Sequence, residues 1–191
     1  MIPVRLRAGA STCVGLALFT FLAAPVLSAQ DVTWRNRATF YGDNTEFFTP
    51  YRVGETILGA QLRTWLDIRP SRRTQVLAGV FGDYRYGSDE FADEVKPIIS
   101  FRYRTDHLTG VLGTLKNADR HGYLEPLQVT TLELTRPIEY GLQLLMDRAL
   151  WDLDLYINWQ GLNTSATREI FDYGLLLQVH PTKWLDLEWQ N

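Results

Sequence analysis

The sequence predicts an all-β fold: an antiparallel up-and-down transmembrane β-barrel, of which this chain holds about the nine amino-terminal strands. Three observations predict it. Apolar and polar residues alternate with a period of two, the connections alternate between long and short, and the amino terminus has the layout of an export signal. We therefore expect a cleaved signal peptide over residues 1–29 and one β-barrel domain, incomplete in this chain, over residues 30–191.

The amino-terminal segment has the three parts of a secretory signal peptide. Arg5 and Arg7 form a basic start, Val14–Leu27 is almost wholly apolar, and the small residues Ser28 and Ala29 close the segment. The apolar stretch is shorter than the ~20 residues of a spanning helix, so cleavage after about Ala29 is favoured over a retained anchor.

Strict alternation is clearest over Trp151–Gln160, where Trp and aliphatic residues share one face and Asp, Tyr, Asn and Gln share the other. This period is that of a strand with one apolar and one polar face. Eight further segments are predicted as strands for the same reason: 32–41, 57–68, 75–86, 98–104, 108–115, 139–146, 173–180 and 184–190. Several are near the ~9–11 residues that cross a bilayer when tilted.

The connections between these strands are long and short in strict turn. Residues 42–55, 87–97, 116–138 and 161–172 form the long set, while 69–73, 105–107, 147–150 and 181–183 form the short set. Up-and-down barrels of the outer membrane have this pattern, with short turns at the periplasmic end and longer loops outside. Leu127–Thr135 could be another strand, and we place it in the third long connection because this preserves the alternation.

Composition excludes two classes of protein. The 24 aromatic residues (9 Phe, 9 Tyr, 6 Trp) and a charged fraction of 21% are untypical of a disordered chain. The chain has 19 basic and 22 acidic residues and no long basic run, so the sequence does not indicate a basic surface that binds nucleic acid.

These patterns together resemble the porin-like β-barrels of the Gram-negative outer membrane, at the level of architecture and without a specific family. The resemblance implies location in the outer membrane and a channel for passive or substrate-selective transport of small polar solutes, including saccharides. It implies outer-membrane lipid, lipopolysaccharide and the barrel-insertion machinery as partners. Nine is an odd number of strands, whereas bacterial single-chain barrels have an even number, which is why the chain is expected to hold part of a longer barrel.

The polar faces of the predicted strands would then line the pore. Charges of both signs fall on this face and are the candidate pore-lining residues: Arg35, Arg37, Arg63, Asp67, Asp83, Arg85, Arg102, Glu139, Asp152, Asp154, Asp186 and Glu188. Four aromatic residues are candidates for the lumen: Trp65, Phe81, Tyr156 and Trp184. Such a lining would select solutes by charge, although the same side chains could merely hydrate the lumen or pair across strands.

Two alternatives come from other classes. A soluble or surface-exposed β-sandwich that binds glycans would show the same alternation. An outer-membrane hydrolase could use His121 in an extracellular loop, with Asp119, Glu125, Asp89 or Asp93 as its acid, although no spacing enforces this contact. The sequence carries no known nucleophile, zinc or phosphate-loop motif. We therefore expect no enzyme, no catalytic residue, no metal site and no cofactor.

Overall fold

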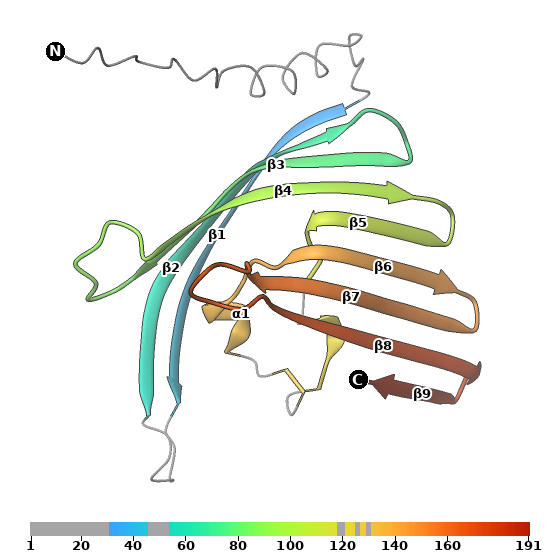
Figure 1. Ribbon diagram of the computed structural model, residues 1–191. Coiled ribbons are helices and arrows are strands. Elements are labelled where there is room, and N and C mark those ends of the chain that lie inside the picture. Colours follow the sequence, from blue (N-terminus) through green and yellow to red (C-terminus); the bar gives the residue numbers. More distant parts are fainter. Residues whose placement is uncertain (1–30, 46–53, 118–120, 125–126, 129–130) are drawn as a thin grey trace, which may run out of the picture.

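The computed structural model describes residues 31–45, 54–117, 121–124, 127–128 and 131–191. The predicted signal peptide lies outside these residues. Nine strands and one short helix follow one another along the chain (Figure 1): β1 (Asp31–Thr45), β2 (Glu55–Arg69), β3 (Thr74–Arg85), β4 (Glu94–Arg104), β5 (Leu108–Thr114), α1 (Leu132–Thr135), β6 (Tyr140–Arg148), β7 (Trp151–Gly161), β8 (Ile170–Thr182) and β9 (Leu185–Gln190). Within the described residues, no helix has the length and hydropathy to cross a bilayer.

All nine strands belong to one antiparallel sheet in chain order, β1 to β9, so each strand pairs with its neighbours in sequence. The pairing of β1 with β2 extends from Asp31 opposite Arg69 to Thr45 opposite Glu55. The predictions of an all-β fold, nine strands and an up-and-down order are confirmed. The prediction of a barrel is not met as a closed structure, because β1 and β9 are the two edges of an open sheet in the part of the chain that the structure describes.

The two faces of the curved sheet differ in polarity, as the alternation requires. The convex face carries large apolar side chains that are exposed, among them Leu58, Leu62, Ile99, Leu142 and Leu187. The concave face carries most of the charged and amide side chains, several of them buried. Since apolar residues normally avoid water, the convex face is the side of the sheet that needs a partner.

The described parts of the connection between β5 and β6 lie against the concave face, and Figure 1 shows the sheet curling around the part that carries α1. Two buried apolar clusters lie beneath it. One joins Leu115 and Tyr123 of the connection to the sheet, and the other joins Ile138 to Phe81. The core therefore forms between the sheet and this connection. The segment 127–135 is placed in the connection by the alternation of loop lengths, and its described residues do lie there and include α1.

Candidate functional site

A buried imidazole between two carboxylates is the most tightly built polar group on the concave face. The Nδ1 atom of His121 lies 2.9 Å from Asp154 Oδ2, and its Nε2 atom lies 2.8 Å from Glu139 Oε2. The His121 side chain has no exposed area (0%). The amide of Gln143 donates to both carboxylate oxygens of Asp154 at 2.9 Å, which fixes that carboxylate beside the ring. We call these four residues the His121 network.

Backbone contacts hold the connection where it can deliver His121 to the sheet. Leu115 N–H donates to the carbonyl oxygen of Glu139 at 3.0 Å, which closes the base of the connection. Lys116 N–H donates to Gln143 Oε1 at 2.9 Å, and Gln143 Nε2 donates back to the Lys116 carbonyl at 3.0 Å. His121 has a φ of 58° and Gly122 a φ of 79°. Two successive left-handed residues reverse the chain and turn the ring inward.

Aromatic rings complete the enclosure of His121. The Tyr156 ring stacks on the imidazole with centroids 3.9 Å apart and planes at 11°. The Tyr123 ring meets Tyr156 edge-on at 6.2 Å. Gly174 on β8 lies beneath both tyrosines, where a Cβ atom would clash with Tyr123 and Tyr156. The absence of a side chain at residue 174 therefore makes room for the stack.

Gly174→Ala is expected to destabilise the folded chain by about 1–3 kcal/mol, because the new methyl group must displace two packed rings. Gly82→Ala is the matched control, since a Cβ atom there meets no atom within 4 Å. The free energy of unfolding in urea, measured in detergent, checks the difference. Equal free energies for the two variants would contradict the described packing.

The two carboxylates control the protonation of His121. Burial opposes its positive charge, but the hydrogen bonds and charges of Asp154 and Glu139 outweigh burial and raise the pKa of His121 to about 9. The ring is therefore an imidazolium at neutral pH and donates a hydrogen bond from each nitrogen. It is a poor base in this state and a well-placed proton donor.

The His121 network separates two hollows on the concave face. An inner cavity of about 460 Å³ lies toward β1, β2 and α1, and Glu139 is in its wall. A second cavity of about 490 Å³ lies toward the short turns, and Asp154 is in its wall. Lys116 lines both. Within the described residues its amino group has no ion-pair partner, and burial lowers its pKa. A molecule in the inner cavity would therefore meet Glu139 and Lys116 together.

The candidate pore-lining residues occupy the concave face or its rim, and the structure groups them into local pairs. Arg35 Nε lies 3.2 Å from Asp67 Oδ2, and Arg85 Nε lies 3.6 Å from Asp83 Oδ2. Arg63 donates to the Pro137 carbonyl at 3.0 Å and lies over the Phe81 ring. Arg37 and Trp65 line the inner cavity, which Arg102 also borders. The connection thus occupies much of the space that an open pore would need.

Other candidates lie apart from the His121 network. Asp152 and Asp186 flank His180 at 3.1 and 2.8 Å near the β8–β9 turn, and Glu188 accepts from Gln178. Trp184 is 82% exposed, because the chain turns there between β8 and β9 rather than continuing as a strand.

His121 differs most from its predicted surroundings. It was expected in an extracellular loop, whereas it is buried against the sheet. Of the acids expected beside it, Asp119 and Glu125 lie outside the described residues, Asp93 accepts from Arg85 N–H at 2.6 Å, and Asp89 lies in the same β3–β4 connection. Asp154 and Glu139 were predicted only as pore lining. The only sequence signal for burial is the apolar content of the connection.

Gln143 and Lys116 were not singled out from the sequence, because an amide on a strand and one lysine in a loop carry no pattern. No cluster of three or more His, Cys, Asp or Glu is arranged to hold a metal ion in the described part of the chain.

The described part of the chain is therefore an antiparallel β-sheet protein with exposed apolar side chains on its convex face and a buried acid–histidine network on its concave face. The family described as Lipid A 3'-O-deacylase-type matches residues 26–190, and the chain belongs to this family. A search of the curated proteins found no match.

Membership corrects two predictions. The chain is not a porin-like channel, and neither transport nor the glycan-binding alternative is supported, because the family is one of deacylases. The expectation of a protein without enzymatic function is wrong for the same reason. The physical cause of both errors is that alternation and loop lengths describe a sheet and say nothing of what its polar face does. The family does agree with an outer-membrane or envelope location and with lipid A or lipopolysaccharide as a substrate or partner.

Proposed function

We propose that this protein is an outer-membrane esterase that removes an ester-linked acyl chain from a glycolipid of the lipid A class. The match to the Lipid A 3'-O-deacylase-type family over residues 26–190 carries this proposal. The His121 network supports it from the structure, since it offers a proton donor and a carboxylate 2.8 Å apart at the wall of a cavity. An acylated substrate would be reached from the surrounding lipid.

The convex face supports a place within the membrane. Its exposed apolar side chains extend across the sheet, from Phe40 on β1 through Leu62 and Ile99 to Leu187 on β9. Hydrocarbon is the environment that covers such a surface at least cost. In this arrangement the sheet lies in the outer membrane, and the long connections face outward.

Leu62→Arg is expected to destabilise the membrane-inserted protein by about 2–4 kcal/mol, because it puts a cation at mid-depth on the lipid face. Thr33→Arg is the control, as Thr33 lies on the opposite face directly across from Asp67. Unfolding by urea from phospholipid vesicles measures both. If the two variants unfold alike, the convex face does not contact lipid.

The proposed hydrolysis uses Glu139 and His121 as a pair. Water in the inner cavity attacks the ester carbonyl and gives its proton to the Glu139 carboxylate. The His121 imidazolium, reached when Glu139 turns aside, gives its proton to the departing alcohol oxygen. The products are a fatty acid and an alcohol, and the proton on Glu139 returns to His121 across their 2.8 Å contact. Asp154 keeps the ring oriented throughout.

Cations around the inner cavity fit the charge of such a substrate. Arg37, Arg63, Arg102, Arg136 and Lys116 line it, against the carboxylates of Glu133 and Glu139. A phosphorylated glycolipid is an anion, and the oxygen of a tetrahedral ester intermediate also carries negative charge. The backbone of Lys116 is hydrogen-bonded to Gln143 of the His121 network, and we assign Lys116 the stabilisation of that oxygen.

The test is deacylation of lipid A by the purified full-length chain in detergent micelles. Mass spectrometry is expected to show lipid A lighter by one acyl chain, together with the free fatty acid. Heat-modifiable gel migration confirms that the protein is folded. Intact lipid A after long incubation with folded protein would refute the proposal.

A further inference from the structure

A pocket of about 430 Å³ lies at the short-turn end of the concave face, away from the His121 network. Its wall contains six arginines, contributed by β1, β2, the β2–β3 turn and β4: Arg35, Arg69, Arg72, Arg73, Arg102 and Arg104. Asp67 is the one carboxylate among its lining residues. We call this hollow the arginine pocket.

The charges in the arginine pocket do not balance. Asp67 is nine-tenths or more buried and pairs with Arg35 at 3.2 Å and with Arg69 at 3.1 Å. It also accepts from Gln75 at 2.8 Å, so its hydrogen-bonding capacity is committed. Within the described residues, the other four guanidinium groups have no carboxylate within ion-pair distance.

The fold brings these unpaired cations together rather than dispersing them. Arg104 N–H donates to the Arg73 carbonyl at 2.7 Å, which ties the end of β4 to the β2–β3 turn. Arg102 lies opposite Gln75 in the β3–β4 register, and its Nε atom donates to Ser100 Oγ at 3.2 Å. That bond orients the Arg102 guanidinium through Nε alone, and its two terminal nitrogens take no part in it. Like charges held this close repel one another unless an anion lies between them.

We propose that the arginine pocket binds a phosphate group. Guanidinium groups match phosphate oxygens in paired hydrogen bonds, and several of them converging on one hollow favour a doubly charged anion over a carboxylate. The phosphate is carried by a lipid headgroup or is free in solution, and both present the same oxygens to the pocket. The arginine pocket shares no residue with the His121 network, and it shares Arg102 and Trp65 with the wall of the inner cavity.

Phosphorus NMR on the full-length chain in a phosphate-free detergent tests the site. Inorganic phosphate and a short-chain phosphatidic acid are titrated in separate samples, and line broadening reports binding. Broadening of both resonances assigns the site to the phosphate group alone, and broadening of only the lipid resonance assigns it to a headgroup. Broadening of neither resonance overturns the proposal.

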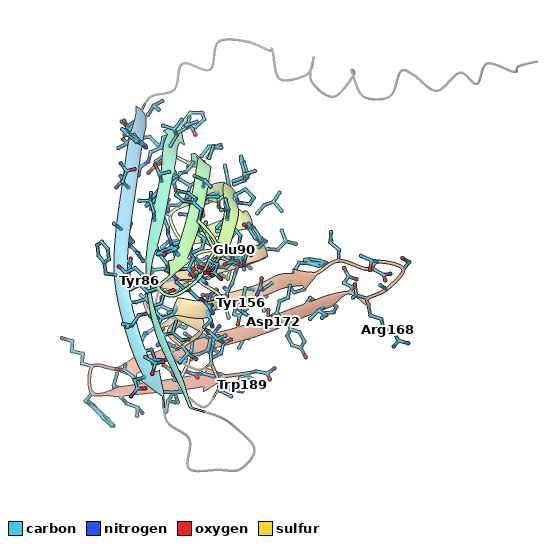
Figure 2. All side chains as sticks on the ribbon, turned by 90° about the vertical axis from the view of Figure 1, so that its left-hand side faces the viewer. Tyr86, Glu90, Tyr156, Arg168, Asp172 and Trp189 are labelled. Atoms are coloured by element: carbon cyan, nitrogen blue, oxygen red, sulfur yellow. The ribbon has the colours of Figure 1, made fainter. Side chains whose placement is uncertain are left out.

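The double variant Arg102→Gln/Arg104→Gln is expected to weaken binding at least about tenfold, since each charge-assisted hydrogen bond accounts for roughly a tenfold change in Kd. The control Arg148→Gln/Arg168→Gln removes the same charge elsewhere. Arg148 ends β6, and Figure 2 shows Arg168 at the tip of the β7–β8 hairpin, far from the other labelled residues. If both double variants weaken phosphate binding equally, the effect comes from the net charge of the protein, and the proposed site is overturned. Each variant must show the same heat-modifiable gel migration as the unmodified protein, because this establishes that it is folded.

Discussion

Replacing His121 by asparagine is expected to lower the rate of lipid A deacylation by about 10²–10⁴-fold, the usual contribution of a positioned proton donor. Asparagine fills similar space and can hydrogen-bond, but it cannot release a proton to the alcohol oxygen. The measurement is the initial rate of fatty-acid release from lipid A micelles. Full activity in folded His121→Asn protein would exclude the proposed chemistry.

His180→Asn is the matched control for this variant. His180 also lies between two carboxylates, Asp152 at 3.1 Å and Asp186 at 2.8 Å, but near the β8–β9 turn and outside the His121 network. Its replacement is expected to change the rate by no more than about twofold. This corresponds to a change in activation free energy well under the 1.4 kcal/mol that a tenfold change in rate requires.

A second variant separates chemistry from folding, because His121→Asn leaves two carboxylates without their cation and can itself weaken the fold. Glu139→Gln keeps the shape of the side chain and leaves Asp154 on the ring. It removes the group that takes the proton from water, and a loss of at least about 10²-fold is expected. Retained activity in both variants would show that the deacylase centre lies elsewhere.

The stability of the folded chain is expected to fall as the pH rises through about 9. The pKa of His121 is raised to about 9 in the folded chain from 6.5, so folding favours the protonated ring. The resulting stabilisation is fully present below pH 6.5 and is lost as the ring deprotonates near pH 9. The size of the pKa change corresponds to up to about 3 kcal/mol.

Urea unfolding in detergent between pH 6 and pH 10 measures this loss. In the described part of the chain, the groups that face the His121 ring are the carboxylates of Asp154 and Glu139, the amide of Gln143 and the ring of Tyr156. His121 is the group in this network whose pKa is raised into this range. The His121→Asn variant should therefore lack the step. A step of equal size in that variant would assign the transition to another group.

The strands could be predicted from the sequence because each has one apolar and one polar face. The positions of the strand ends could not be predicted, since the pairing between strands continues past the residues in which apolar and polar side chains alternate. β1 continues through Asp43 and Asn44, which have no apolar pattern but pair with Ile57 and Thr56 on β2. β4 begins at Glu94, well before the predicted start at residue 98, because Glu94 pairs with Asp83.

The site was much less accessible to prediction. Asp154 and Glu139 could be assigned to the polar face by register, but a register does not say which loop will lie against them. His121 reaches them only because the β5–β6 connection folds inward, and that depends on Leu115, Tyr123 and Ile138 finding apolar partners on the sheet. Such partners are set by tertiary packing, which a period of two does not encode.

The strictly sequential order of the sheet has a consequence for how the protein reaches its folded state. Every strand pairs with a chain neighbour, so the hairpins can form one after another from locally available partners. The His121 network cannot be completed when the β5–β6 connection is first made, because Asp154 lies on β7, which comes later in the chain. Until β7 has paired with β6, His121 has no Asp154 to hold it. The His121 network therefore forms late in folding, after these strands of the sheet have assembled.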